Sequence, residues 1–306
     1  MKVELKKMVT AAFGVCACTL VVATASAQSV DGTNLFFISD VTQCNSQSQA
    51  NALAVKSLVG DTDYSILMTE ANNCSGSYAT AYQYVSDIWN SEYERIYAVP
   101  GNHDYMTGIE GFENYFGNGL AVLEEGVPNS NWKIIRINTN YPGMPYGGGG
   151  MDESQWYWQK IGLRTVLNSF PYQGITCVLI YGHHPRYTSG MHQTDANMSS
   201  RMQEIWDILD EFDVELYISG HDHLYERMYP MDAEGNRVTD GNGTVQIISG
   251  TGGADLRGPS AVQSNSAKII SEKHGLLEIE LGDNSFRTAF VDTDENYYDV
   301  YTGACH

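Results

Sequence analysis

The sequence predicts an α/β fold, because segments with the pattern of buried strands alternate with segments of helical pattern. Residues 35–38 form an uninterrupted apolar run, and residues 47–58 follow with helical composition and spacing. The alternation continues to residue 218, which favours a largely parallel sheet covered by helices. From Thr244 onward one strand pattern follows another, so the second half should add mixed or antiparallel strands.

The individual elements follow from local periodicity and from turn residues at their ends. A loop containing the glycine run 147–150 should interrupt the middle of the chain, and no repeat, low-complexity segment or long linker divides it. Residues 28–306 should therefore form a single domain. The expected strands are 35–38, 64–68, 95–99, 132–137, 175–181 and 214–218, and the expected helices are 47–58, 78–89, 152–167 and 199–212.

Residues 1–27 have the pattern of a secretory signal peptide. Three lysines precede a mostly apolar run over residues 8–23, and Ala25-Ser26-Ala27 offers small residues before a cleavage point. The apolar run is shorter than the roughly 20 residues of a membrane span, and no later segment is long and apolar enough. We expect a secreted or periplasmic protein without a membrane span, the alternative being a retained N-terminal anchor.

The charge balance is strongly acidic. Removing the signal peptide takes three lysines and one glutamate from totals of 17 basic and 37 acidic residues, which leaves 14 and 36 and a formal charge of −22. Nucleic-acid binding normally requires a basic stripe, and no Lys/Arg cluster is visible, so nucleic acid is not an expected partner. A small phosphoester remains compatible if metal cations reverse the local field.

Four cysteines remain after the signal peptide, in a compartment that permits disulfides. Cys44 and Cys74 follow the ends of neighbouring predicted strands, so we predict that they pair, although sequence alone does not fix connectivity. Cys177 lies in an apolar strand and is predicted to be a buried free thiol. The pairing of Cys305 is left open.

Candidate metal ligands follow the ends of predicted strands, where ligands gather in open α/β sheets. The five histidines of these clusters each follow a glycine directly or closely, which lets the backbone turn and the imidazole project. In Gly220-His221-Asp222-His223, alternate residues of an extended segment point the same way, so both imidazoles should reach one pair of metals. Without a metal, these two histidines could be ordinary surface residues, and Asn102 could be a turn asparagine hydrogen-bonded to its own backbone. The clusters are Asp40, Asn102-His103-Asp104, His183-His184 and His221-Asp222-His223.

Taken in order, these segments resemble the calcineurin-like metallophosphoesterase superfamily, and within it the purple and tartrate-resistant acid phosphatases. The resemblance covers nearly the whole mature chain, and the ordered set of motifs is far more specific than any one of them. The motifs are Gly101-Asn102-His103-Asp104, Asp152-Glu153-Ser154-Gln155-Trp156, Gly182-His183-His184-Pro185, the segment from Gly220 to Arg227, Ile248-Ser249-Gly250-Thr251-Gly252-Gly253 and His274-Gly275.

The resemblance implies a four-layer αββα sandwich of two mixed β-sheets and a pair of metal ions, Fe, Zn or Mn. It implies a secreted acid phosphatase that hydrolyses small phosphomonoesters by attack of metal-activated hydroxide. The catalytic residues outside the metal shell would be His103 and His192, which neutralise phosphoryl oxygens and protonate the leaving group. The implied ligands are Asp40 and His223 for one metal, Asn102, His183 and His221 for the other, and Glu70 as the bridge.

The sequence departs from the family pattern at the bridging motif. Thr69-Glu70-Ala71-Asn72-Asn73 stands where the family has Gly-Asp-Asn-x-Tyr, so Glu70 replaces the bridging aspartate and Asn73 replaces the tyrosinate of the purple enzymes. Asp40-Val41-Thr42 likewise replaces Asp-x-Gly or Asp-x-His. These changes put a preference for ferric iron and the integrity of the first metal site in question.

Two further functions stay open: a phosphodiesterase using the same site, and a non-catalytic phosphate-binding protein with an impaired first metal site. Oligomeric state is not predicted. Arg186 and Arg227 could both meet a phosphate, although a structural carboxylate pair is an equal alternative for Arg227. His184 should lie outside the ligand shell. Packing is favoured over substrate contact for Tyr141, Tyr146, Trp156 and Trp158.

Overall fold

A computed structural model describes residues 34–117, 122–126, 131–144, 150–239 and 241–306. The predicted signal peptide, Tyr146 and most of the glycine run lie outside these ranges. Among the described residues, no helix has both the length and the apolar character that crossing a bilayer requires.

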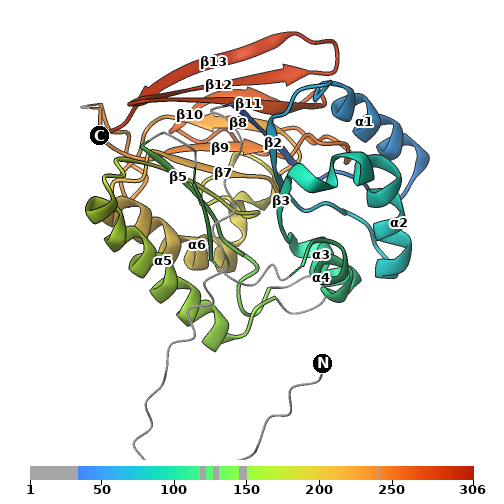
Figure 1. Cartoon of the computed structure of the whole chain (residues 1–306), viewed down its shortest axis with the longest axis horizontal. Coiled ribbons are helices and arrows are strands. Elements are labelled where there is room, and N and C mark those ends of the chain that lie inside the picture. Colours follow the sequence, from blue (N-terminus) through green and yellow to red (C-terminus); the bar gives the residue numbers. More distant parts are fainter. Residues whose placement is uncertain (1–33, 118–121, 127–130, 145–149, 240) are drawn as a thin grey trace, which may run out of the picture.

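Two β-sheets face one another in the middle of the molecule (Figure 1). In the six-stranded sheet, β1, β2 and β3 are parallel and β11, β12 and β13 are antiparallel. In order across this sheet the strands are β13 (Tyr297–Ala304), β12 (Ser285–Asp292), β11 (Gly275–Gly282), β1 (Asn34–Ser39), β2 (Ser65–Thr69) and β3 (Ile96–Val99).

The second sheet has seven strands and is also mixed. Strands β5, β6, β7 and β9 run parallel, whereas β4, β8 and β10 pair antiparallel with their neighbours. In order these are β10 (Ser266–Ile270), β8 (Tyr225–Met228), β9 (Val245–Ser249), β7 (Leu216–Ser219), β6 (Cys177–Tyr181), β5 (Trp132–Arg136) and β4 (Leu123–Gly126).

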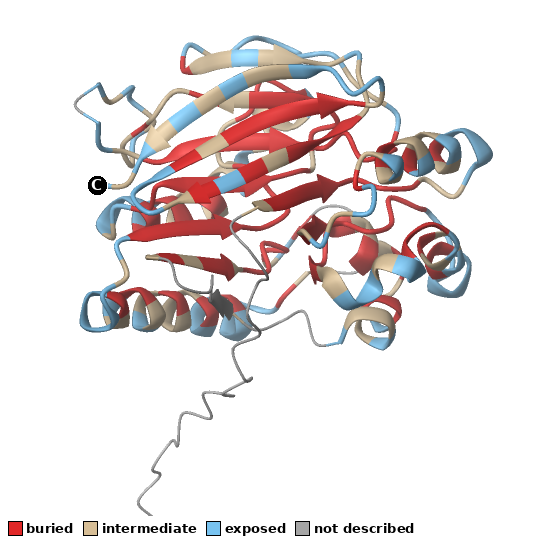
Figure 2. Cartoon of the chain, turned by 45° about the horizontal axis from the view of Figure 1, so that its top comes forward, coloured by how far each residue is buried: buried red, intermediate tan, exposed pale blue. Residues whose placement is uncertain are grey.

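Helices cover the outer face of each sheet, which gives the predicted four layers (Figures 1 and 2). Helices α1 (Ser46–Ser57) and α2 (Tyr78–Trp89) pack on the six-stranded sheet, and α5 (Glu153–Gln173) and α6 (Ala196–Glu211) pack on the other. Two short helices, α3 (Asn102–Thr107) and α4 (Glu110–Phe116), follow β3. The α/β sandwich expected from the family resemblance is confirmed.

Alternation of side chains along the strands assigns the core to three layers. On β1, Phe37 faces the space between the sheets, whereas Phe36 and Ile38 face α1 and α2. On β6, Leu179 points between the sheets and Ile180 points toward α5 and α6. Because both faces of these strands are buried, they read in the sequence as continuous apolar runs, as parallel strands do.

The predicted disulfide Cys44–Cys74 is present, but the prediction for Cys177 was wrong. Cys177 forms a disulfide with Cys305, 128 residues away, and the two Cα atoms lie 5.4 Å apart. The apolar strand around Cys177 correctly indicated burial, but it carried no information about a partner on the C-terminal segment. This bond joins the start of β6 to the residues after β13.

Several aromatic and basic side chains make structural contacts, and packing had been predicted for Tyr141 and Trp156. Tyr141 and Trp156 are buried in the core beside α5 and α6, whereas Trp158 is about half exposed. Arg227 pairs with Asp299 at 2.8 Å on the edge strand β13. Arg186 donates hydrogen bonds to Gln203 and Ser199, away from the residues of the site.

Candidate dinuclear metal centre

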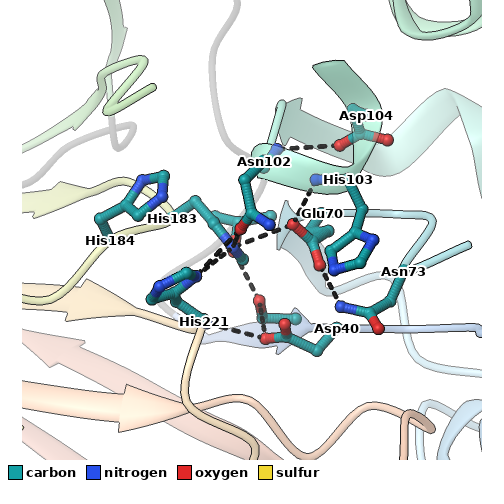
Figure 3. Close-up of polar contacts among 12 residues, drawn as sticks. Asp40, Glu70, Asn73, Asn102, His103, Asp104, His183, His184 and His221 are labelled. Atoms are coloured by element: carbon teal, nitrogen blue, oxygen red, sulfur yellow. Dashed lines mark hydrogen bonds and ion pairs between the residues drawn. The ribbon is translucent and has the colours of Figure 1, made fainter. Parts of the chain in front are cut away.

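The candidate ligands gather where the carboxyl ends of parallel strands from both sheets meet. Asp40 follows β1, Glu70 follows β2, and Asn102 begins α3 immediately after the loop that closes β3. His183 and His221 follow β6 and β7 of the second sheet. Their side chains turn toward one another (Figure 3), so residues far apart in the chain form one cluster.

One half of the cluster is built around His183. Its Nε2 lies 3.0 Å from Glu70 Oε2 and 3.0 Å from Asn102 Oδ1. His221 Nδ1 lies 2.9 Å from the same Asn102 oxygen and 3.3 Å from His183 Nε2. These contacts bring together every residue that the sequence predicted for the second metal, including the bridging glutamate.

The other half is built around Asp40. Its Oδ1 lies 3.4 Å from His223 Nε2, and the Asn73 amide nitrogen contacts Glu70 Oε1 and lies 3.3 Å from His223 Nε2. Asn73, which stands at the tyrosinate position of the family pattern, therefore lies beside Glu70 and His223. Asp40, Glu70 and His183 offer ligand atoms that all lie within 4.8 Å of one another.

The donor set fits a pair of cations. Two oxygens that only accept and two ring nitrogens make four close contacts with one another, and two neutral imidazoles supply at most two protons. Asp40 Oδ1 is buried and accepts no hydrogen bond. Buried lone pairs without donors are costly, and a bound cation would satisfy them. Imidazole, carboxylate and amide ligands suit divalent transition metals.

The electrostatics keep both carboxylates ionised. Burial by itself would raise the pKa values of Asp40 and Glu70, but neighbouring imidazoles outweigh it and hold both below their usual range. Burial opposes a charge on His183, yet Glu70 and Asp40 raise its pKa. Burial, together with the surrounding imidazoles, lowers the pKa of His221 well below its usual value, so His221 is neutral as a ligand must be.

Unusual backbone conformations aim these side chains. Asp40, Glu70 and His221 have φ values of 57°, 45° and 72°, in the left-handed region that non-glycine residues rarely adopt. The prediction that residues 221–223 are extended was therefore wrong. The chain turns at His221, so His221 reaches Asn102 while His223 reaches Asp40. Of these two histidines, His221 thus belongs to the half around His183, and His223 belongs to the half around Asp40.

Two motif glycines are needed for space. A Cβ on Gly101 would lie 2.2 Å from Glu70 Oε2, and a Cβ on Gly220 would lie 1.9 Å from Ser39 Oγ and 2.4 Å from Asp40 Oδ2. These glycines allow the β3 and β7 loops to approach the carboxylates of the other loops closely. Their proximity to His and Asn in the sequence therefore has a steric cause.

His103 and His192 lie beside the cluster and line a cavity of about 660 Å³. His103 Nδ1 lies 3.2 Å from the Cys74 carbonyl, and His192 Nδ1 lies 2.8 Å from Asp222 Oδ1. The His192 ring also stacks on His221, with ring centroids 4.0 Å apart. Both predicted catalytic histidines thus face the same cavity from opposite loops.

His184 lies to the left of His183 in Figure 3. Its Nδ1 is 3.0 Å from Thr139 Oγ1. One of its ring nitrogens lies within 4.8 Å of those of His183 and His221, but its contacts include neither Glu70 nor Asn102. His184 is therefore near enough to His183 and His221 to share a metal with them, and its Nε2 is buried without a hydrogen-bond partner among the described residues. Its place outside the ligand shell stays a prediction.

Sequence reasoning placed Asp104 and Asp222 in the candidate clusters but missed their role, which is to hold the site loops in place. Asp104 accepts from the Gly101 N–H at 2.8 Å and from the Tyr82 hydroxyl at 2.8 Å, so it fixes the loop that carries Asn102. Burial, reinforced by the charge of Glu70, raises the pKa of Asp104 to about 7. Asp222 holds His192. A helix-capping pattern at Gly101 and Asp104 was available as a signal, whereas nothing local marks Asp222.

Comparisons with known proteins agree with this geometry. Residues 34–225 match the family described as calcineurin-like phosphoesterase. An acid phosphatase of Aspergillus ficuum is 29% identical over 128 residues, which is 41% of this chain but only 20% of the fungal protein.

Two solved structures share the fold over most of this chain. Purple acid phosphatase PPD1 from yellow lupin (Lupinus luteus) seeds aligns with a TM-score of 0.68 and 15% identity, covering 90% of this chain and 54% of the plant chain. GAP50, the anchor in the inner membrane complex of Plasmodium, aligns with a TM-score of 0.69 and 16% identity over 89% of each chain. By its sequence match and its fold, this chain belongs to the calcineurin-like phosphoesterase family.

Proposed function

We propose that the protein is an exported, metal-dependent phosphatase that hydrolyses small phosphomonoesters. The observation that carries this proposal is the convergence of two carboxylates, an amide and three imidazoles at the meeting edges of the two sheets. Family membership supports phosphoester chemistry, and two disulfides are typical of an oxidising compartment.

The ligands divide between two metal positions that share Glu70. Asp40 and His223 would hold the first metal, and Asn102, His183 and His221 would hold the second. The Asn73 amide nitrogen donates to Glu70 and so positions the bridging carboxylate. When bound, such a pair lowers the pKa of a water molecule and stabilises charge on the oxygens of an in-line displacement. The family uses a dinuclear centre, while the metals themselves, Fe, Zn or Mn, are part of the proposal.

The two cavity histidines are suited to bind the phosphoryl group and move a proton. The Cys74 carbonyl only accepts, so His103 Nδ1 must carry a proton, and the same holds for His192 Nδ1 beside the Asp222 carboxylate. Each Nε2 is left to hold or release a proton at the substrate. His103 and His192 thus act as the phosphoryl-binding and leaving-group acid residues.

The first test combines metal analysis with turnover. The mature chain should contain two transition-metal ions and hydrolyse a chromogenic phosphomonoester faster than the matching diester. His221→Ala should lower turnover on the order of a thousandfold, because it removes one ligand of the second metal. This corresponds to an activation free energy that is higher by about 4 kcal/mol. His306→Ala, near the C-terminus, is the matched control. Unchanged turnover in His221→Ala would refute the proposal, and faster diester hydrolysis would instead identify a phosphodiesterase.

A second candidate is a non-catalytic phosphate-binding protein with an impaired first metal site. Glu70 is one methylene longer than the aspartate of the family pattern, and Asn73 supplies a neutral amide where that pattern has a tyrosinate. The fold itself is compatible with other roles, since GAP50 is described as an anchor.

Restoring the family pattern separates the two candidates. In the proposed enzyme Glu70 and Asn73 act as a matched pair in direct contact, so Glu70→Asp with Asn73→Tyr should leave turnover the same or lower it. An impaired site should respond in the opposite way, with an additional bound metal and a gain approaching the roughly hundredfold that correct placement can give. Elemental analysis and turnover of both proteins decide between these outcomes.

A further inference from the structure

The cavity beside the metal centre contains a cation that the proposed reaction does not use. Arg257 lines this cavity with His103, His192 and the ligand His223. The cavity also contains one carboxylate, Asp195, but that side chain caps α6 by accepting from the Met198 N–H at 2.9 Å. Arg257 is therefore the positive group available to a molecule that enters.

The loop that carries Arg257 is fixed to a predicted metal ligand at two points. The Arg257 backbone N–H donates to the His223 carbonyl at 2.9 Å, and His223 Nδ1 donates to the Asp255 carbonyl at 2.8 Å. These two bonds place the start of the Arg257 side chain at a defined position relative to the metal centre. Because the loop is already held in place, less conformational entropy is lost when the Arg257 side chain binds an anion.

The guanidinium group of Arg257 has only a weak partner. Its Nη1 donates to Met191 Sδ at 2.9 Å, and a thioether is a poor acceptor. No carboxylate among the described residues lies within ion-pair distance of it. Carboxylates do pair with five other arginines of this acidic chain: Arg95, Arg164, Arg201, Arg227 and Arg287.

We propose that Arg257 binds a second anionic group of the substrate, a phosphate or a carboxylate, so the site prefers small phosphoesters that carry one. This inference rests on the proposed function. The oxygens of the reacting phosphoryl group already have the metal positions, His103 and His192. Arg257 lines the same cavity as His223 and contacts Met191, which is half exposed. Its five N–H donors match a carboxylate or phosphate in two-point contact.

The substrate class also follows from the charge of the protein. A chain with 37 acidic and 17 basic residues repels polyanions over most of its surface. A second negative group on the substrate would weaken binding unless a cation met it inside the cavity. With Arg257 in the cavity, a second negative group on the substrate strengthens binding.

The test compares probes with one and two anionic groups. Binding of methylphosphonate, phosphonoacetate and methylenediphosphonate to the metal-loaded protein is measured by calorimetry, in wild type and in Arg257→Gln. We expect the substitution to weaken at least one doubly anionic probe by about 10- to 100-fold and methylphosphonate by less than about threefold. Arg257→Lys, which keeps the charge but loses the fork, should be intermediate.

Arg237→Gln is the matched control, because Arg237 lies over the Tyr229 ring in a separate cavity. Greater loss for methylenediphosphonate identifies a second phosphate, and greater loss for phosphonoacetate identifies a carboxylate. An equal loss for methylphosphonate, or no loss for any probe, overturns the proposal.

Hydrolysis of a simple aryl phosphate by wild type is measured in parallel. Absence of turnover with the expected binding difference would defeat the proposed enzyme and keep the anion subsite. Normal turnover without a binding difference would do the reverse.

Discussion

Replacing Gly220 with alanine should lower phosphatase turnover by roughly a hundredfold or more, although glycine has no functional group. The new Cβ would lie 1.9 Å from Ser39 Oγ and 2.4 Å from Asp40 Oδ2, so the loop after β7 and the end of β1 must separate. That separation moves His221 and Asp40, which belong to opposite halves of the metal centre. Bound metal per chain, turnover and the free energy of unfolding are the quantities to measure.

Gly258→Ala is the matched control for this experiment, because a Cβ there would meet nothing within 4 Å. The free energy of unfolding of Gly220→Ala should be about 1–3 kcal/mol lower than that of wild type, which is the usual effect of overpacking. A Gly220→Ala protein with wild-type metal content and turnover would show that the loops tolerate separation, and the steric account of this motif would be wrong.

The two disulfides should contribute to different properties when each is removed by paired Cys→Ala changes. Loss of Cys177–Cys305 opens the longer loop, with 128 residues against 30, so it should cost more stability, about 5 against about 3.5 kcal/mol in the chain-entropy estimate. Loss of Cys44–Cys74 should affect the metal centre instead. This bond joins the loop after Asp40 to the loop after Glu70, and the Cys74 carbonyl holds His103.

Denaturant unfolding and metal titration of both variants check this division. Removing Cys44–Cys74 should weaken metal binding or turnover by about 10- to 100-fold, as changes just outside a ligand shell do. Removing Cys177–Cys305 should leave turnover within about twofold below the unfolding transition, because Cys177 begins β6 and His183 follows its other end. If the variant without Cys177–Cys305 loses more turnover than the variant without Cys44–Cys74, then Cys44–Cys74 does not hold the metal-binding loops as proposed.

The ends of strands were the most predictable feature of this protein. Continuous apolar runs such as residues 35–38 identify strands buried on both faces, and a polar residue immediately after such a run marks an edge of the sheet. Asp40, His183 and His221 could be found in this way before their spatial relation was known, whereas Glu70 came only from the family resemblance. Their assembly into one centre required the meeting of two sheets, for which the family resemblance and not the local pattern provided the expectation.

What the sequence failed to show depends on distant parts of the chain. The turn at His221 arises because the β7 loop must pass close to Asp40, and the pattern of residues 220–223 alone gave an extended segment. The partner of Cys177 is brought to it by the six-stranded sheet. The role of Asp222 was likewise not predictable, since it is set by His192, 30 residues earlier.

The left-handed backbone at Asp40, Glu70 and His221 implies a conflict between thermal stability and catalysis. Each such residue costs roughly 1–2 kcal/mol, and a whole domain is commonly stable by only about 5–15 kcal/mol. A glycine at any of the three positions would relax the chain and remove a ligand in the same step. Laboratory evolution for heat tolerance alone would therefore erode the metal centre, and only simultaneous selection for turnover would preserve it.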